Sequence, residues 1–160
     1  MTCKELSAAA DIASAAALSV RAHEGLRAQL PFLPVRSEAD LGPRIEWVTR
    51  KGVVLGLVEE GRLQAFLGAF PLESFRNGGP GSVGPDWCHG PSTLAINGMY
   101  VEAGSRRTGV GCRLLGSLAR EAGAADKTVV SVDFETTNLE AYAFWTRWFR
   151  PVTWSLERRV

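Results

Sequence analysis

A short run of arginine and glycine residues is the part of the sequence best suited to bind an anion. The run R-R-T-G-V-G spans residues 106–111, between an expected strand and an expected helix. The first N–H groups of a helix lack partners within it and carry the positive end of the helix dipole, so they bind phosphate oxygens. Gly109 and Gly111 let an anion approach the backbone, and Arg106 or Arg107 can add a bidentate contact. The run therefore favours a diphosphate site; the alternative is an arginine pair on a solvated turn.

A second glycine motif is placed less well. Residues 79–84, G-P-G-S-V-G, match the dinucleotide-binding pattern G-x-G-x-x-G letter for letter. That pattern needs a strand before it and a helix opening from it. Here Pro85 follows directly, and Pro91 comes before any periodic segment, so no helix is available to hold a pyrophosphate. We interpret residues 76–91 as a glycine- and proline-rich loop, which at this length is usually functional or mobile.

Few side chains are suited to proton transfer. Asp133 and Glu135 fall on one face of an expected strand, and Glu135 is a candidate general base, acting directly or through water. The alternative is that both carboxylates are solvated or form salt bridges. His89 in the glycine-rich loop is a rival base. A nucleophilic Cys88–His89 pair is disfavoured because adjacent side chains point in different directions.

Hydrophobic periodicity predicts the elements that position these residues. The expected order is two helices, two strands, and then strand, helix, strand, helix, strand, which indicates one mixed α/β (α+β) domain over residues 1–160. The expected elements are a helix from Leu6 to about Arg27, a helix that starts at Pro43, strands at 53–58, 63–70 and 93–102, a helix from Val110 with Gly123 as its C-cap, a strand at 128–135, a helix at 138–148 and a strand at 152–159.

Composition excludes several classes of protein. The 160 residues are 46% hydrophobic and 22% charged, which is the balance of a soluble globular domain rather than a disordered one. Eighteen basic and seventeen acidic residues leave a net charge of +1, so a nucleic-acid partner is not expected. No stretch approaches the roughly 20 apolar residues of a membrane span, and we expect a cytoplasmic protein. The three cysteines are widely spaced, so neither a disulfide framework nor a metal site is expected.

Two segments resemble the signatures of the GCN5-related N-acetyltransferases, the GNAT superfamily. Residues 101–111, V-E-A-G-S-R-R-T-G-V-G, are similar to its acyl-CoA-binding motif, (Q/R)-x-x-G-x-(G/A) after a strand that ends in valine. Residues 138–152, N-L-E-A-Y-A-F-W-T-R-W-F-R-P-V, resemble its second signature, N-x-x-A-x-x-(F/L)-(Y/W). The resemblance implies the GNAT fold, a mostly antiparallel central sheet flanked by helices. It covers residues 92–160 by motif and 1–75 by element order.

The resemblance also implies a role for individual residues. Backbone groups of Met99 and Val101 would pair with the pantetheine arm of acetyl-CoA as if it were an added strand. Asn138 would meet the pantetheine or a water near the thioester, and Phe144 would pack beside the coenzyme. The pyrophosphate would lie against Arg106, Arg107, Thr108, Gly109, Val110, Gly111 and Cys112.

The sequence departs from the family pattern at several positions. Arg107 stands where glycine is frequent and Thr108 where a basic residue is frequent, so the positive charge has moved by one position. Trp145 occupies the place of the tyrosine that protonates the leaving thiolate in many members. An indole N–H donates hydrogen bonds but does not titrate usefully, so Trp145 cannot be that acid. Tyr142, three residues earlier, is the candidate that replaces it.

The sequence therefore predicts an acyl-CoA-dependent N-acyltransferase, using acetyl-CoA as cosubstrate and no metal, that acylates a small-molecule amine by direct attack. One alternative is a CoA-binding module without transfer activity; another is a protein-interaction domain that keeps the fold. The acceptor is not identified by any motif, and a homodimer is left open.

Overall fold

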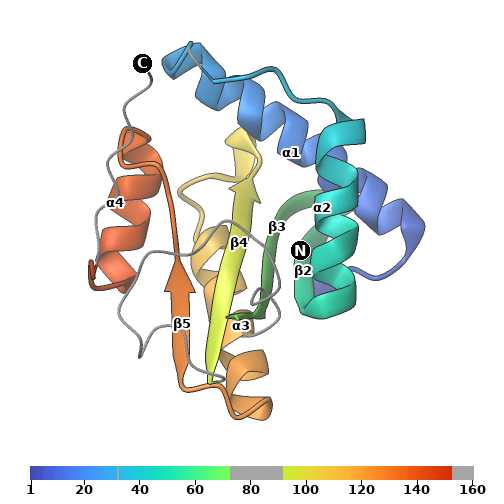
Figure 1. Ribbon diagram of the computed structural model, residues 1–160. Helices are drawn as coiled ribbons and strands as arrows, with labels where there is room; N and C mark the ends of the chain where they lie inside the picture. Colours follow the sequence, from blue (N-terminus) through green and yellow to red (C-terminus); the bar gives the residue numbers. More distant parts are fainter. Residues whose placement is uncertain (32, 73–91, 153–160) are drawn as a thin grey trace.

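The computed structural model describes residues 1–31, 33–72 and 92–152. Within this part of the chain the strands form one sheet in the order β1-β2-β3-β4-β5 (Figure 1). The first four are antiparallel to their neighbours, and only the β4–β5 pair is parallel. The strands are β1 (Thr2–Glu5), β2 (Val53–Glu59), β3 (Arg62–Pro71), β4 (Thr93–Val101) and β5 (Val129–Val132).

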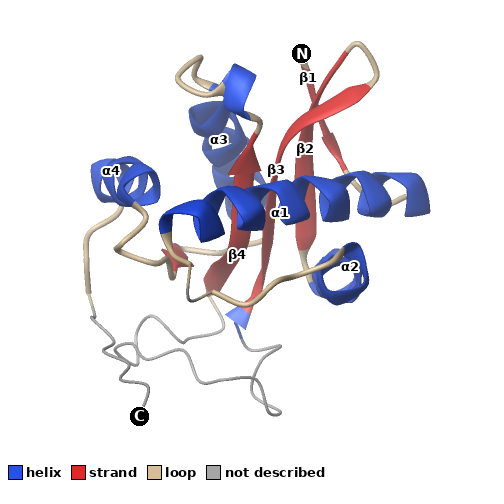
Figure 2. Cartoon of the chain, turned by 90° about the horizontal axis from the view of Figure 1, so that it is seen from above, coloured by secondary structure: helices blue, strands red, loops and turns tan. Residues whose placement is uncertain are grey.

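Helices cover both faces of the sheet (Figure 2). The helices α1 (Ala9–Gln29) and α2 (Glu38–Lys51) pack on one face, and α3 (Val110–Ala124) packs on the opposite face. The shorter helix α4 (Leu139–Trp148) contributes Trp145 to the α3 side. The sheet is therefore the middle layer between two hydrophobic cores.

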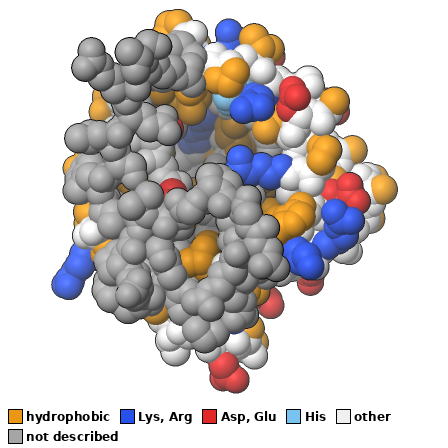
Figure 3. Space-filling view, in the orientation of Figure 1, with side chains coloured by type: hydrophobic (Ala, Val, Ile, Leu, Met, Phe, Trp, Pro, Cys, Tyr) orange, Lys and Arg blue, Asp and Glu red, His pale blue; other side chains and the backbone are white. Residues whose placement is uncertain are grey.

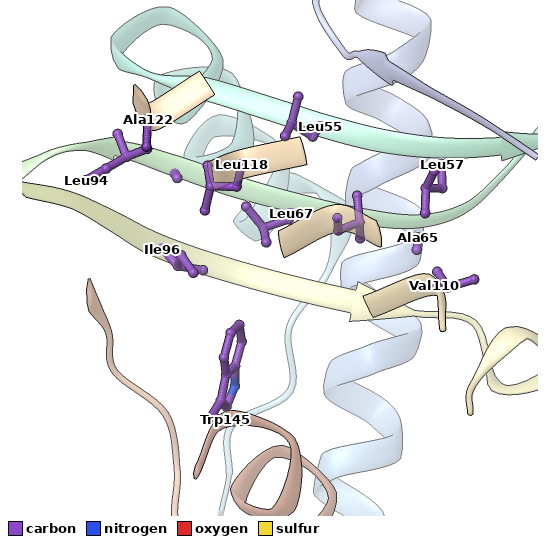
Figure 4. Close-up of a cluster of buried hydrophobic side chains, with 12 residues drawn as sticks. Leu55, Leu57, Ala65, Leu67, Leu94, Ile96, Val110, Leu118, Ala122 and Trp145 are labelled. Atoms are coloured by element: carbon purple, nitrogen blue, oxygen red, sulfur yellow. The ribbon is translucent and has the colours of Figure 1, made fainter. Parts of the chain in front are cut away.

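The central strand β3 is apolar on both sides because both faces of the sheet are covered. Leu67 and its alternate neighbours Ala65 and Ala69 pack toward α3, whereas Phe66 and Phe70 pack toward α1 and α2. Figure 4 shows the α3-side core, where side chains from the sheet, α3 and Trp145 converge. Successive side chains of a strand point to opposite faces, so one strand serves both cores.

The first strand and the start of the first helix differ from the sequence prediction. Residues 2–5 form β1, which pairs with β2, and α1 begins at Ala9 rather than at Leu6. The N–H of Leu6 donates to the carbonyl of Val54 over 2.7 Å, and its buried side chain fills the space beside Gly56. Leu6 is thus an apolar anchor between strand and helix, and helical spacing alone could not distinguish the two roles.

The predicted start of the second helix at Pro43 is wrong, because α2 begins at Glu38 and contains Pro43. The N–H and hydroxyl of Ser37 donate to the Asp40 carboxylate over 2.7 and 2.8 Å. The backbone bond from Ser37 holds the pKa of Asp40 below its usual value. Proline fixes a backbone angle close to that of a helix and removes one hydrogen bond, so this well-capped helix accommodates Pro43 in its second turn.

The later elements follow the prediction in order, with different ends. The strand expected at residues 128–135 stops at Val132, because its pairing with β4 stops there. Helix α3 continues past Gly123 to Ala124, and Ala125 is its C-cap. Most of the strand expected at 152–159, and the whole 76–91 loop, lie outside the described residues.

Leu114 tests the contribution of the α3-side core to stability. Its side chain is fully buried, so Leu114→Ala should lower the free energy of unfolding by about 2–5 kcal/mol. Leu139→Ala is the control, because Leu139 is 73% exposed and its truncation should change stability by less than about 0.5 kcal/mol. Urea denaturation of the two variants measures both values, and equal effects would contradict the packing described.

Candidate functional site

The parallel strands β4 and β5 are paired along only half of β4. Thr93 to Ile96 of β4 pair with Val129 to Val132 of β5. Strand β4 then continues to Val101 without a strand partner on that side among the described residues. We call this second half the open half of β4, because among the described residues no strand lies beside it. The segment that leads from β5 into α4 runs on this side of β4 (Figure 1).

The backbone groups of Met99 and Val101 face the side of β4 that has no strand partner among the described residues. The N–H of Glu102 donates to the carbonyl of Gln64 over 2.8 Å, so the main chain of Glu102 faces β3. In an antiparallel pair the direction alternates from residue to residue, so the N–H and C=O of Val101 and Met99 face away from β3. These are the two residues for which the resemblance implies pairing with the pantetheine arm.

The turn before α3 presents N–H groups that lie outside the hydrogen-bond ladder of the helix. Gly109, with φ of +85°, is the N-cap, and the first helical bond runs from the N–H of Arg113 to the carbonyl of Gly109. The N–H groups of Val110, Gly111 and Cys112 thus have no partner within the helix, and they carry the positive end of its dipole. The hydroxyl of Thr108 donates to the carbonyl of Ser105 over 2.7 Å and so bonds within the turn itself.

Gly111 connects three of the predicted site residues. A Cβ at Gly111 would lie 2.9 Å from the Phe144 ring and 3.5 Å from the end of the Met99 side chain. The N-terminus of α3, the middle of α4 and the open half of β4 therefore meet at this point. A glycine at this position was expected to let an anion approach the backbone, and the structure gives a second reason for it, the close packing of Phe144.

The two arginines of the motif differ in their contacts. The guanidinium of Arg106 donates to the carbonyl of Val101 over 3.1 Å and to the Glu140 carboxylate over 2.7 Å, and it lies 5.7 Å from the Tyr100 ring centroid. Arg106 thus joins the end of β4 to the first turn of α4. Arg107 has φ of +62°, is exposed and has no hydrogen bond or ion pair with the described residues. Arg107 is therefore the arginine of the pair that is available to an anion.

Asn138 is engaged by its own helix. It is the N-cap of α4, and its Oδ1 accepts a hydrogen bond from the N–H of Ala141 over 3.1 Å. Asparagine at this position satisfies one of the N–H groups that a helix start leaves unpaired. Asn138, the first residue of the segment that resembles the second GNAT signature, thus has a structural role. Its side-chain NH₂ has no hydrogen bond with the described residues.

The aromatic residues of α4 divide between core and surface. Trp145 is buried and contacts Phe144 and Phe149 edge-to-face, with ring centroids 5.0 and 5.4 Å apart. Its ring points toward Ile96 of β4 (Figure 4). Tyr142 is 40% exposed, and its ring lies edge-to-face with Phe134, with ring centroids 6.3 Å apart. Trp145 is therefore a packing residue, and Tyr142 is the exposed hydroxyl on this helix.

The candidate bases are placed less regularly than the sequence suggests. Asp133 and Glu135 lie beyond the end of β5, in the connection to α4, rather than on one face of a strand. Both side chains are exposed and have no hydrogen bond or ion pair with the described residues. Glu135 is thus free to accept a proton, and its role as a base stays a prediction. His89 and Cys88 lie outside the described residues.

A cavity that the sequence analysis missed lies on the other side of the sheet. Its volume is about 140 Å³, and its walls come from α1, α2, β2, β3 and β4. At its edge, Nε and Nη2 of Arg44 both donate to Oδ1 of Asn97, over 2.9 and 2.6 Å. Asn97 is the extra residue of a β-bulge in β4, which an asparagine–glycine pair inside an apolar strand could have indicated.

Within the described ranges, no group of three histidine, cysteine, aspartate or glutamate side chains is arranged to hold a metal ion. In the same part of the chain, no helix combines the length and apolar character that crossing a bilayer needs.

Comparisons with known proteins give a family match. The family model described as "Acetyltransferase (GNAT) family" matches residues 21–149. None of the curated proteins searched matches the chain.

Solved structures are similar over nearly the whole chain. Aminoglycoside antibiotic 6'-N-acetyltransferase from Acinetobacter haemolyticus is 19% identical, with a TM-score of 0.69 and coverage of 100% of this chain and 98% of that one. AAC(6')-Iy in complex with a bisubstrate analogue of CoA is 15% identical, with a TM-score of 0.66 and coverage of 99% and 97%. Ribosomal-protein-alanine N-acetyltransferase from Brucella melitensis is 13% identical, with a TM-score of 0.67 and coverage of 99% and 97%. The predicted fold, a mostly antiparallel sheet flanked by helices, is confirmed.

The capping role of Asn138 can be tested by a pair of variants. Asn138→Ala removes the acceptor of the Ala141 N–H and should lower the free energy of unfolding by about 1 kcal/mol. Asn138→Asp retains an acceptor at the N-cap and should leave stability nearly unchanged. Thermal and urea unfolding of both variants give the comparison. Equal destabilisation by alanine and aspartate would contradict the capping role.

Proposed function

Because the chain belongs to the GNAT acetyltransferase family, we propose that it transfers an acyl group, acetyl in the first instance, from CoA to a primary amine within a ternary complex. The open half of β4 beside the unpaired N–H groups of α3 is the observation that carries this proposal. Coenzyme A fits both features. Its extended pantetheine arm can pair with the open half of β4 like a strand, and its diphosphate can bind the N–H groups at the start of α3.

In this proposal the coenzyme lies across the N-terminus of α3 and along β4. The N–H groups of Val110, Gly111 and Cys112, with Thr108 and Gly109 of the turn, hold the pyrophosphate. Arg107 adds a charge-assisted contact, because its guanidinium is free of ion pairs with the described residues. Met99 and Val101 pair with the pantetheine, Phe144 packs against it, and the NH₂ of Asn138 faces the same arm.

Arg106 has a different part in the proposal. Its Nε occupies the carbonyl of Val101, one of the groups offered to the pantetheine, while Glu140 holds its other end. Binding of the coenzyme would therefore shift Arg106 away from Val101. Because the Arg106–Glu140 pair is exposed to solvent, the cost of this shift is small.

The chemistry requires a neutral amine next to the thioester. An amine with a pKa near 10.4 is neutral in only about one molecule in several thousand at pH 7, so deprotonation costs about 4–5 kcal/mol. Glu135, directly or through a water, is the proposed base. The amine nitrogen then attacks the carbonyl carbon, the backbone N–H of Val101 stabilises the developing oxyanion, and the C–S bond breaks. The thiolate takes a proton from the hydroxyl of Tyr142, which is regained from water.

A second candidate function is a CoA-binding module without transfer activity. The burial of Trp145 favours it, because the position that carries an acidic hydroxyl in many family members is here part of the core. Thiol release from acetyl-CoA across a panel of primary amines separates the two functions. Release above the rate of hydrolysis supports the transferase, and CoA binding without release supports the module.

Coenzyme binding at the α3 turn is tested by introducing a carboxylate there. Gly111→Glu should weaken CoA binding by about 100-fold or more, because a negative charge would replace the phosphate and displace Phe144. Thr108→Glu, which does not involve the Phe144 contact, should have the same direction. Isothermal titration calorimetry with CoA measures the affinity of each variant.

The matched control for these variants is Gly116→Glu. Gly116 lies on the same helix and is exposed, with open space around it, so this variant adds the same charge away from the turn. Its affinity for CoA should stay within about threefold of the parent value. Unchanged CoA affinity in both Gly111→Glu and Thr108→Glu would place the diphosphate elsewhere and overturn the proposed site.

The role of Tyr142 is tested by removing only its hydroxyl. Tyr142→Phe keeps the ring contact with Phe134, so stability should not change. If Tyr142 is the acid, kcat should fall by about 10²- to 10⁴-fold while the dissociation constant of CoA stays the same. Steady-state kinetics with a thiol reagent measure the change. A variant with full kcat would show that the thiolate is protonated by another donor.

A further inference from the structure

The cavity beside Arg44 has an apolar interior and one charged group at its edge. Ile45, Val48 and Phe66 form much of its wall, and its volume of about 140 Å³ is enough for a group the size of a benzene ring. Among the described residues that line it, Arg44 is the only ionisable one. Figure 3 shows Lys and Arg side chains beside a hollow on the side of α1 and α2. An occupant of this cavity would therefore meet a positive charge.

The guanidinium of Arg44 is held in place with part of its donor set unused. Its Nε and Nη2 donate to Oδ1 of Asn97, which fixes the plane of the group at the β4 bulge. A guanidinium has five N–H donors, so three remain, two of them on Nη1. One N–H of Nη1 and the remaining N–H of Nη2 can together bind the two oxygens of a carboxylate, because guanidinium and carboxylate are both planar. Arg44 is exposed, so these donors are accessible from solvent.

The cavity also lies where an acceptor would approach the coenzyme. Asn97 and Gly98 line it and directly precede Met99, the first β4 residue whose backbone is offered to the pantetheine. The cavity is on the α1–α2 face of the sheet, whereas the anion-binding turn belongs to α3 on the other face. The second half of β4 is common to both, because Asn97 and Gly98 line the cavity and Met99 contacts the start of α3 at Gly111.

We propose that this cavity binds the acceptor, and that the acceptor is a primary amine carrying a carboxylate, which Arg44 binds, and a small apolar group, which the cavity encloses. This inference rests on the proposed acyl transfer and adds the chemical class of the acceptor. Polycationic amines, such as aminoglycosides, would instead place an ammonium group beside the guanidinium of Arg44 and be repelled by it.

The test compares amines that differ only in the carboxylate. The probes are L-leucine, L-phenylalanine and glycyl-leucine, each paired with its carboxamide, with neamine as a polycation. Acetylation rates give kcat/KM for each member of a pair. An amide and an acid differ in the basicity of a nearby amine, so the informative quantity is the change in the acid-to-amide ratio between parent and variant, in which that difference cancels.

We expect Arg44→Gln to lower the acid-to-amide ratio by about 10- to 100-fold for at least one pair, the usual effect of losing a charge-assisted hydrogen bond. Arg44→Lys keeps the charge and should retain part of the preference. Arg44→Glu should reverse it and raise kcat/KM for neamine. Gain of activity with a cation is a readout that a purely structural role of Arg44 would not produce.

The matched control is Arg50→Gln on the same helix. Arg50 is exposed, does not line the cavity and has only a long ion pair with Glu46 at 4.0 Å, so the ratio should not change. An acid-to-amide ratio that is the same in the parent, Arg44→Gln and Arg50→Gln overturns the inference. So does parent activity that is highest with neamine.

Two further measurements separate this inference from the proposed transfer. CoA binding measured by calorimetry reports on the α3 turn and should be unaffected by Arg44→Gln. If the parent protein does not bind CoA at all, the proposed transferase function is refuted. If CoA binds but no amine is acetylated, binding of each acid and amide to the CoA-saturated protein is followed by NMR. Tighter binding of the acid, lost in Arg44→Gln, supports the carboxylate site, and equal binding refutes it.

Discussion

The structure depends on a strand that loses its partner halfway along its length. A backbone N–H or C=O without a hydrogen-bonding partner is costly when it is removed from water, so strands inside a sheet are normally paired on both sides. Here β5 ends at Val132 while β4 continues to Val101, and the groups of Met99 and Val101 that face away from β3 have no strand beside them in the described part of the chain. We propose that a strand-like ligand pairs with these groups, taking the carbonyl of Val101 from Nε of Arg106, its partner in the structure. The proposed binding site is thus defined by main-chain groups more than by side chains.

The N-termini of α3 and α4 are packed close to the open half of β4. Gly111 allows Phe144 and Met99 to approach the start of α3. The Asn138 cap fixes the first turn of α4, the helix that carries Phe144. Trp145, next to Phe144, is fixed in the core on the same helix. Both the close packing of Phe144 and the N–H groups at the start of α3 thus result from placing the N-termini of α3 and α4 beside β4.

Local patterns in the sequence predicted part of this site and long-range contacts determined the rest. The turn at residues 106–111 and the helix after it were predictable, because glycine positions and helical periodicity are local signals. The start of α2 was mispredicted at Pro43 because the Ser37–Asp40 cap outweighs one lost hydrogen bond. The end of β5 depends on its partner strand, and the pairing of Arg44 with Asn97 joins residues 53 positions apart. Neither can be inferred from spacing.

The ion pair between Arg106 and Glu140 has a consequence for how the protein responds to its medium. Dissolved ions screen an exposed pair, so higher ionic strength loosens the link between β4 and α4 and frees the carbonyl of Val101. The same screening weakens the attraction between the α3 turn and a diphosphate. For the proposed coenzyme the first effect strengthens binding and the second weakens it. The affinity for the coenzyme should therefore vary less with salt concentration than the charge of the coenzyme alone would suggest.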